Sequence, residues 1–266
     1  MAPLRIALFQ GPGGVPHTRE DSLAALSDAA RRAAGAGARL LVTSELYLTG
    51  YAVGDALPDL AEEADGPSAR RVAEIAAEHG VAIVYGYPER SGSALHNAAQ
   101  LVGADGTRLA NYRKTHLFGD FETGSFVPGD RAVVQADLDG VRVGLLICYD
   151  VEFPENVRAH ALAGTELLLV PTALMRPYEI VAQTVLPTRA WESQLYIGYA
   201  NRCGPEGDFD FAGLSCLAAP DGTVRARAGA CGDLVVADVD PELLKASRAE
   251  NTYLSDRRPE LYGSLG

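Results

Sequence analysis

The chain has 266 residues, of which 47% are hydrophobic and 22% charged, a composition typical of globular proteins that excludes disorder over most of its length. Its 23 Lys and Arg residues against 35 Asp and Glu residues give a net charge of −12, which disfavours nucleic acid and anionic membranes as partners. No apolar run approaches the roughly 20 residues of a membrane span, and no signal-peptide pattern opens the chain. We therefore expect a cytoplasmic protein that acts on a neutral or cationic small molecule.

The first third of the chain alternates apolar runs with segments of helical periodicity. Leu23, Leu26, Ala30 and Ala33 recur at the spacing of one helix face. This pattern predicts strands at residues 5–10, 39–45 and 81–87, and helices at residues 19–35 and 68–79. Strands that alternate with helices favour crossover connections, with the helices outside a sheet.

The rest of the chain mixes hairpins with a second strand–helix series. The Asp-Gly pairs at 105–106, 139–140 and 221–222 are turn signals. They predict the strand pairs 97–102 with 108–112, 132–137 with 141–148, and 215–219 with 224–227. Further strands are expected at 166–171, 195–201 and 233–239, and further helices at 153–164, 179–193 and 241–248. Two similar halves of this kind indicate an α/β fold with two mixed sheets face to face and helices outside, in one domain over residues 1–266.

The four cysteines favour neither a disulfide framework nor a metal site, because none forms a C-x-x-C pair or has a histidine at the spacing of metal ligands. Cys203, Cys216 and Cys231 have no setting that suggests chemistry. Cys148 differs, because it ends the apolar run VRVGLLIC just before a helix. A thiol at such a turn is exposed beside backbone N–H groups that can bind an oxyanion, although a buried structural cysteine is the common alternative.

Two further charged residues end predicted strands. Glu45 closes RLLVTSE, where a carboxylate either caps a turn or faces a cleft at the strand ends, and Lys114 follows RLANY, where a surface lysine is the simplest reading. Together with Cys148 they form a coherent acyl-transfer site, because an ammonium favours the thiolate and a carboxylate can move protons. His116 is a second candidate base, which we rank lower because the sequence offers it no obvious orienting partner.

At these residues the chain resembles the nitrilase superfamily of carbon–nitrogen hydrolases. The resemblance rests on SELYLTGY around Glu45, NYRKTHLF around Lys114 and GLLICYDVEFPE around Cys148, and it continues through IVYGYPER, LLLVPTA and residues 213–222. It implies a four-layer α-β-β-α sandwich that pairs through its helical faces into a homodimer or a higher homo-oligomer. It implies neither a metal nor an organic cofactor.

The resemblance also implies roles for particular residues. Cys148 would be the nucleophile and Glu45 the general base and acid. Lys114 and the backbone N–H of Tyr149 would stabilise the tetrahedral intermediate. Glu122 stands where many members carry a second glutamate that positions substrate or the lysine.

Within the superfamily the chain looks most like the 5-aminopentanamidase-type aliphatic amidases. The closest segments are IVYGYPER, YRKTHLFGD, CYDVEFPEN and VPTALMRPY, with Leu174 where those relatives carry Asn. The expected activity is hydrolysis of a small linear amide, with an ω-amino or ω-guanidino group, through a cysteine thioester. A nitrilase or an N-carbamoyl-amine hydrolase would use the same residues. A catalytically inert binding or assembly protein is the alternative outside enzymes.

A cationic substrate end requires a carboxylate opposite it. The candidates are Asp120, Asp150, Glu152, Asp208 and Asp210. Asp208 and Asp210 lie in the segment PEGDFDFAG, interleaved with Phe209 and Phe211. Aromatic faces beside carboxylates can hold ammonium or guanidinium groups, so this segment, together with Asp150, is the expected substrate-binding region.

Overall fold

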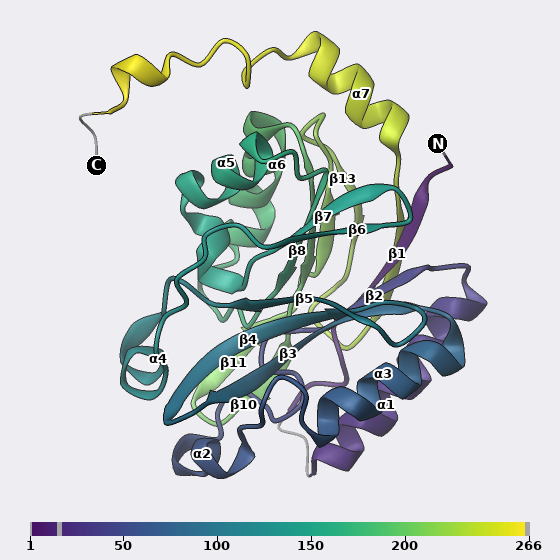
Figure 1. Ribbon diagram of the computed structural model, residues 1–266, viewed down its shortest axis with the longest axis vertical. Helices are drawn as coiled ribbons and strands as arrows, with labels where there is room; N and C mark the ends of the chain where they lie inside the picture. The colour runs from purple at the N-terminus through teal and green to yellow at the C-terminus, as the bar shows by residue number, and fades with distance from the viewer. Residues whose placement is uncertain (1, 15–17, 264–266) are drawn as a thin grey trace.

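Two six-stranded mixed sheets lie face to face in the computed structural model, which describes residues 2–14 and 18–263 (Figure 1). The first sheet has the order β14-β1-β2-β3-β4-β5. Its strands are β14 (Leu234–Val239), β1 (Leu4–Phe9), β2 (Leu40–Val42), β3 (Ala82–Ser91), β4 (Ala94–Val102) and β5 (Arg108–Arg113). The strands β1, β2 and β3 are parallel, whereas β4, β5 and β14 are antiparallel to their neighbours.

The second sheet repeats this plan with the order β13-β12-β9-β8-β7-β6. Its strands are β13 (Val224–Arg227), β12 (Cys216–Ala218), β9 (Tyr196–Ala200), β8 (Leu167–Pro171), β7 (Val141–Leu145) and β6 (Gln135–Leu138). Here β7, β8 and β9 are parallel. A separate hairpin pairs β10 (Cys203–Glu206) with β11 (Phe209–Ala212).

Helices cover the outer face of each sheet (Figure 1). The helices α1 (Arg19–Gly35) and α3 (Pro67–His79) cover the first sheet, and α5 (Pro154–Leu162) and α6 (Leu186–Ser193) cover the second. The other α-helices of the described residues are α2 (Leu57–Leu60), α4 (Gly119–Ser125) and α7 (Pro241–Glu250). The remaining turns are 3₁₀ at Gly54–Ala56, Cys148–Glu152 and Pro259–Leu261, and π-helical at Val181–Val185.

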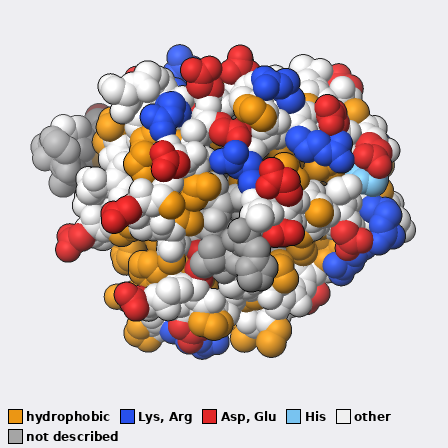
Figure 2. Space-filling view, turned by 90° about the horizontal axis from the view of Figure 1, so that it is seen from below, with side chains coloured by type: hydrophobic (Ala, Val, Ile, Leu, Met, Phe, Trp, Pro, Cys, Tyr) orange, Lys and Arg blue, Asp and Glu red, His pale blue; other side chains and the backbone are white. Residues whose placement is uncertain are grey.

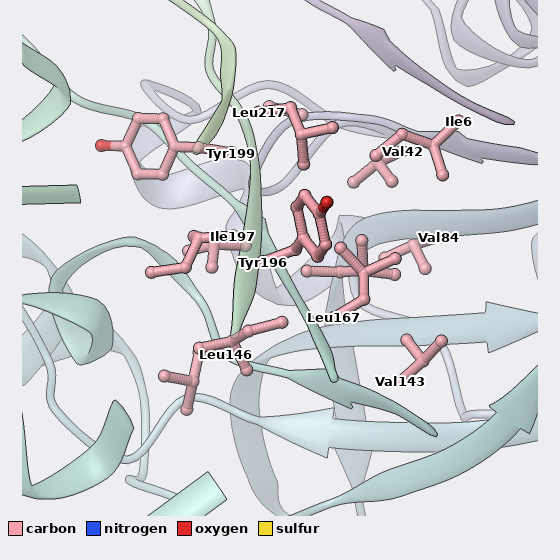
Figure 3. Close-up of a cluster of buried hydrophobic side chains, with 14 of the residues drawn as sticks. Ile6, Val42, Val84, Val143, Leu146, Leu167, Tyr196, Ile197, Tyr199 and Leu217 are labelled. Carbon is pink, nitrogen blue, oxygen red and sulfur yellow. The ribbon is translucent and has the colours of Figure 1, made fainter. Parts of the chain in front are cut away.

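The main core fills the space between the two sheets. Side chains from both sheets meet there without exposure to solvent, including Ile6, Val42, Val84, Val143, Leu167, Ile197 and Leu217 (Figure 3). Alternate residues of β1 point the opposite way, so that Ala7 and Phe9 join α1 and α3 in a second core. Burial on both faces explains why these strands are almost continuously apolar in sequence.

The predicted architecture of two mixed sheets with outer helices is confirmed. The helix at 19–35 and the strand at 224–227 have the expected bounds. The helix predicted at 179–193 is instead a π-helical turn followed by α6. No strand was predicted for the segment at 205–213, but its residues 209–212 form β11, which pairs with β10. The hairpin of β3 with β4 was missed, because Ser91-Gly92-Ser93 is a weaker turn signal than Asp-Gly.

The surface carries side chains of both charges. On the face shown in Figure 2, acidic and basic side chains are intermingled, with hydrophobic side chains between them. Across residues 2–14 and 18–263, no helix combines the length and apolarity needed to cross a bilayer.

Candidate active site

Glu45 lies in a turn beyond β2, not in the strand predicted for residues 39–45. The strand ends at Val42, and at Glu45 the chain bonds to a residue that follows β8. The Glu45 N–H donates to the Thr172 carbonyl at 3.2 Å, and Arg202 Nη1 donates to the Glu45 carbonyl at 3.2 Å. Leu46 has a φ of 47°, a left-handed conformation that turns the chain sharply. The Glu45 backbone is thus held from both sides.

Gly86 of β3 gives this turn its room. A Cβ added at Gly86 would lie 2.5 Å from Leu46 N, 2.6 Å from Ser44 O and 2.9 Å from Glu45 Cα. Backbone atoms cannot move aside as a flexible side chain can, so Gly86→Ala should lower the free energy of unfolding by about 1–3 kcal/mol. Chemical denaturation measures this loss. Gly35→Ala is the control, because its Cβ meets nothing within 4 Å, and equal stability of the two variants would contradict the close approach.

Cys148 begins the 3₁₀ turn Cys148–Glu152, after β7 has ended at Leu145. Its φ is 46°, which is rare for a residue with a side chain and marks a strained bend. The Asp150 carboxylate supports this bend by accepting from the Ile147 N–H at 3.1 Å. Cys148 is 9% exposed, so its thiol lies at the edge of the core and not at the open surface.

Lys114 is buried, with 1% of its surface exposed, and is therefore not the surface lysine that its sequence context allows. Its Nζ donates to Glu45 Oε1 at 2.7 Å and to Glu122 Oε1 at 2.7 Å. Glu122, on the short helix α4, also accepts from the Tyr51 hydroxyl at 2.7 Å and from the Phe118 N–H at 2.8 Å. Two carboxylates and one ammonium thus share a space closed to bulk water.

One oxygen of this cluster has no partner. Glu45 Oε1 accepts from Lys114 Nζ and, at 2.7 Å, from Asn97 Nδ2. Glu45 Oε2 is buried and has no hydrogen-bond partner among the described residues. A buried carboxylate oxygen without a donor is costly, and this cost favours a group that can supply a proton there.

Burial and the neighbouring charges shift the pKa values of Glu45, Cys148 and Lys114. Burial raises the pKa of Glu45 to about 7, against the attraction of Lys114. Burial raises the pKa of the Cys148 thiol well above its ordinary value, and Glu45 adds to this while Lys114 opposes it. Burial lowers the pKa of Lys114, but Glu45, Cys148 and Glu122 together outweigh it and raise the pKa overall. The pKa shifts therefore favour a neutral thiol at Cys148, a carboxylate at Glu45 that titrates near pH 7 and a charged ammonium at Lys114.

A cavity of about 250 Å³ opens beside Cys148. Its wall is mainly apolar and aromatic, and its lining is Phe118, Cys148, Tyr149, Glu152, Ala173, Leu174, Met175 and Tyr178. Leu174 therefore borders the cavity, at the position where the resembling amidases carry Asn. Cys148, Tyr149 and Glu152 all come from the single 3₁₀ turn after β7.

The aspartates that the sequence favoured for substrate binding do not line this cavity. Asp150 is fully buried, and its two oxygens accept from the Tyr112 and Thr115 hydroxyls, the His116 and Ile147 N–H groups and the His116 ring. It has no oxygen left for a ligand and instead holds the turn. Asp208 and Asp210 are exposed on the β10–β11 hairpin, where Asp210 pairs with Arg176 at 3.3 Å. Asp120 is exposed on α4.

His116 has the orienting partner that the sequence did not reveal. Its Nδ1 lies 3.0 Å from Asp150 Oδ1, and its ring stacks on Phe153 with centroids 4.1 Å apart. The hydrogen bond to Asp150 raises the pKa of His116. The ring does not line the cavity beside Cys148.

Several residues of the site carried no signal in the sequence. Asn97 and Tyr51 contact the two glutamates directly. Arg202 and Glu206 form a buried pair with Nη2 2.6 Å from Oε2, and Glu206 accepts from the N–H groups of Tyr51 and Ala52. This pair fixes the segment from Glu45 to Ala52, and only the folded chain brings it there. Across the described ranges, no group of three or more His, Cys, Asp or Glu residues is arranged to hold a metal ion.

Comparisons with known proteins find similar hydrolases and amidases. The family model described as carbon-nitrogen hydrolase matches residues 5–249. The chain is 50% identical to the "Hydrolase in pqqF 5'region" of Pseudomonas protegens, over 98% of this chain and 92% of that protein. It is 40% identical to an (R)-stereoselective amidase of a Pseudomonas species, over 84% of this chain and 81% of that protein.

Among solved structures, the amidase of Nesterenkonia sp. AN1 is similar over 99% of this chain and 100% of that one, with 36% identity and a TM-score of 0.89. A variant of that amidase, with the same coverage, identity and TM-score, carries the product of Michael addition of acrylamide at its active-site cysteine.

Proposed function

Because the chain belongs to the carbon–nitrogen hydrolase family of the nitrilase superfamily and hydrolyses amide C–N bonds, we propose that it cleaves small linear amides through a thioester on Cys148. One observation carries the proposal: the charges of Glu45 and Lys114 act on the Cys148 thiol, and Glu45 keeps one buried oxygen without a partner among the described residues. That oxygen is suited to take and return a proton during acyl transfer.

The first half of the reaction forms the thioester. The substrate carbonyl carbon lies beside Sγ of Cys148, Glu45 Oε2 takes the thiol proton, and the sulfur attacks the carbon. The negative charge that develops on oxygen meets Lys114 Nζ and the backbone N–H of Tyr149, which adjoins Cys148. Glu45, now protonated, gives its proton to the amide nitrogen as the C–N bond breaks. Ammonia leaves, and the acyl group stays on sulfur.

The second half of the reaction reverses these roles. Water enters where ammonia left, Glu45 removes its proton, and the hydroxide adds to the thioester carbon. The C–S bond then breaks, Glu45 returns the proton to the thiolate, and the carboxylic acid leaves. A base with a pKa near 7 suits both halves, because it accepts and donates protons at nearly equal cost at neutral pH.

Glu122 positions the cation that stabilises the intermediate. Its Oε1 holds Lys114 Nζ at 2.7 Å, and its Oε2 is anchored by the Phe118 N–H at 2.8 Å. An ammonium held by two carboxylates is pre-organised, so it needs no rearrangement when negative charge develops on the substrate. We therefore assign Glu122 to the orientation of Lys114.

The rate should depend on pH through Glu45. Burial raises the pKa of Glu45 to about 7, and only the deprotonated carboxylate can accept the thiol proton. We expect kcat/KM to rise with pH up to about 7 and to fall about tenfold for each pH unit well below it. A pH–rate profile between pH 5 and 8 measures this, and a flat profile would contradict the role of Glu45.

The substrate preference is tested by comparing three classes of compound. The cavity beside Cys148 is short and mainly apolar, which favours aliphatic acyl chains. We propose a linear amide with an ω-amino or ω-guanidino group and expect ammonia release from 5-aminopentanamide. The matched nitrile, 5-aminopentanenitrile, and an N-carbamoyl amine of equal length should react at least tenfold more slowly. A faster reaction with either compound would favour a nitrilase or an N-carbamoyl-amine hydrolase instead.

We further propose that the chain works as one domain, in the cytoplasm, as a homodimer. The outer face of the second sheet supports the dimer, because the helical layer exposes Leu162, Ile180 and Trp191. Apolar side chains of this size at an outer face favour contact with a second copy. The free thiols of Cys148, Cys203, Cys216 and Cys231 agree with a reducing compartment.

A further inference from the structure

The cavity beside Cys148 contains one carboxylate. Aromatic rings of Phe118, Tyr149 and Tyr178 form much of its wall, together with aliphatic side chains and Met175. The Phe118 ring meets that of Tyr149 edge-on at 5.2 Å and that of Tyr178 edge-on at 6.3 Å. Glu152 is the only Asp or Glu among the lining residues. A single negative charge in a wall of this kind is an unusual element of an otherwise apolar pocket.

The Glu152 carboxylate has no hydrogen-bond or ion-pair partner within the part of the chain that the structure describes. The two nearby cations make their hydrogen bonds elsewhere, and the buried Nε of Arg189 makes none to a described residue. Arg189 Nη1 donates to Glu192 at 2.8 Å, and its Nη2 donates to the backbone carbonyl of Glu152 at 2.8 Å rather than to the side chain. Lys114 is held by Glu45 and Glu122. Partial burial accordingly raises the pKa of Glu152 against the attraction of Lys114 and Arg189.

The place of Glu152 along the turn suits the far end of a short substrate. Cys148 begins the 3₁₀ turn, and Glu152, four residues later, ends it. A 3₁₀ turn rises roughly 2 Å per residue, so the two residues stand roughly 8 Å apart along the turn. An acyl carbon on Sγ and a cation near Glu152 would thus be separated by a chain of a few methylenes. The apolar wall between them can accommodate that chain.

We propose that Glu152 is the specificity-determining residue that binds an ammonium or guanidinium group at the far end of the amide, with the rings of Phe118, Tyr149 and Tyr178 around it. This inference rests on the proposed function and replaces Asp208 and Asp210 as the cation site. A bound cation gives the partly desolvated carboxylate the charged donor that it lacks. Aromatic faces add cation–π attraction, which is strongest where water is excluded.

The test compares Glu152→Gln with wild-type protein on 5-aminopentanamide, 4-guanidinobutanamide and uncharged pentanamide. We expect wild type to favour the cationic amides. In Glu152→Gln, kcat/KM for the cationic amides relative to pentanamide should fall about 10- to 100-fold, mainly through KM, because a hydrogen-bonded ion pair is lost. Glu155→Gln is the matched control, since it removes the same charge from an exposed position of α5 and should keep the wild-type ratio.

A second measurement needs no variant. Pentan-1-amine carries the cation without the amide, and it should inhibit pentanamide hydrolysis competitively, at least tenfold more strongly than pentan-1-ol. The two cationic amides show whether ammonium or guanidinium fits better. An unchanged preference for cationic amides in folded Glu152→Gln, or equal inhibition by pentan-1-amine and pentan-1-ol, would overturn the role of Glu152. Either result would leave the proposed amidase function standing. Absence of turnover on all three amides would instead overturn the proposed function.

Discussion

Replacing Cys148 by alanine should abolish amide hydrolysis, with a loss of at least about 10⁴-fold in kcat, as expected when a nucleophile is removed. Neither Glu45 nor Lys114 can replace the sulfur, because neither can form and release the acyl intermediate proposed here. The fold should persist, since the variant removes one sulfur atom from a side chain at the edge of the core. Steady-state ammonia release measures the loss, and circular dichroism checks the fold.

Acyl transfer gives a sharper readout than hydrolysis alone. Hydroxylamine attacks a thioester to give a hydroxamic acid and the free thiol, so wild-type protein should form hydroxamate from an amide substrate and Cys148→Ala should not. Cys216→Ala is the control, because Cys216 is fully buried in β12, where burial raises the pKa of its thiol to about 11. That variant should lose stability and keep both activities. Turnover in folded Cys148→Ala would reject the thioester mechanism.

Local pattern predicted the elements whose partners are near in sequence. The helix at 19–35 has a Thr18 cap, acidic residues in its first turn and an apolar face, and each of these signals is local. The strand predicted for 39–45 was wrong at its end, because the Glu45 N–H donates to the carbonyl of Thr172, which lies far away in the sequence. The chain stays buried past Val42, through Thr43, Ser44 and Glu45, whereas the strand itself ends at Val42.

The site was predictable where chemistry-bearing residues end strands, as at Glu45, Lys114 and Cys148. In the structure Lys114 pairs with Glu45, and the charges of both act on the Cys148 thiol, while the catalytic roles of the three residues stay predictions. Asn97, Tyr51 and the pair of Arg202 with Glu206 gave no such signal, since asparagine, tyrosine and ion pairs are ordinary in any protein. Their importance comes from contacts across long stretches of chain. The sequence alone does not show these contacts, so it does not distinguish these residues from ordinary surface residues.

The electrostatics of Cys148 also differ from the expectation. The sequence argument held that Lys114 would favour the thiolate, but burial and Glu45 outweigh that attraction and raise the pKa of the thiol. Lys114 does attract the thiolate, but the loss of hydration on burial is the largest effect on the thiol, and the Glu45 carboxylate adds to it. The thiol is therefore protonated before substrate binds, so its activation requires a base. Proton transfer to Glu45 then matters more for this activation than the charge of Lys114.

Glu45→Gln should lower kcat/KM by about 10²- to 10⁴-fold, the usual range for loss of general acid–base catalysis. The amide oxygen of glutamine can accept from Lys114 and Asn97 as Glu45 Oε1 does, so the variant should keep the geometry of the cluster. The group that replaces Oε2 is an amide NH₂, which cannot take the thiol proton. Steady-state rates across an amide series measure the loss.

The pH profile distinguishes lost proton transfer from mere disturbance of the site. If Glu45 is the group that titrates near pH 7, the fall in kcat/KM below that pH should disappear in Glu45→Gln along with most of the rate. Glu89→Gln makes the same change at another buried carboxylate, which is 2% exposed and paired with Arg113 and Asn111. That control should lose stability but keep the rate and the acid limb. An acid limb that persists near pH 7 in Glu45→Gln would assign the titration, and with it the general base, to another group.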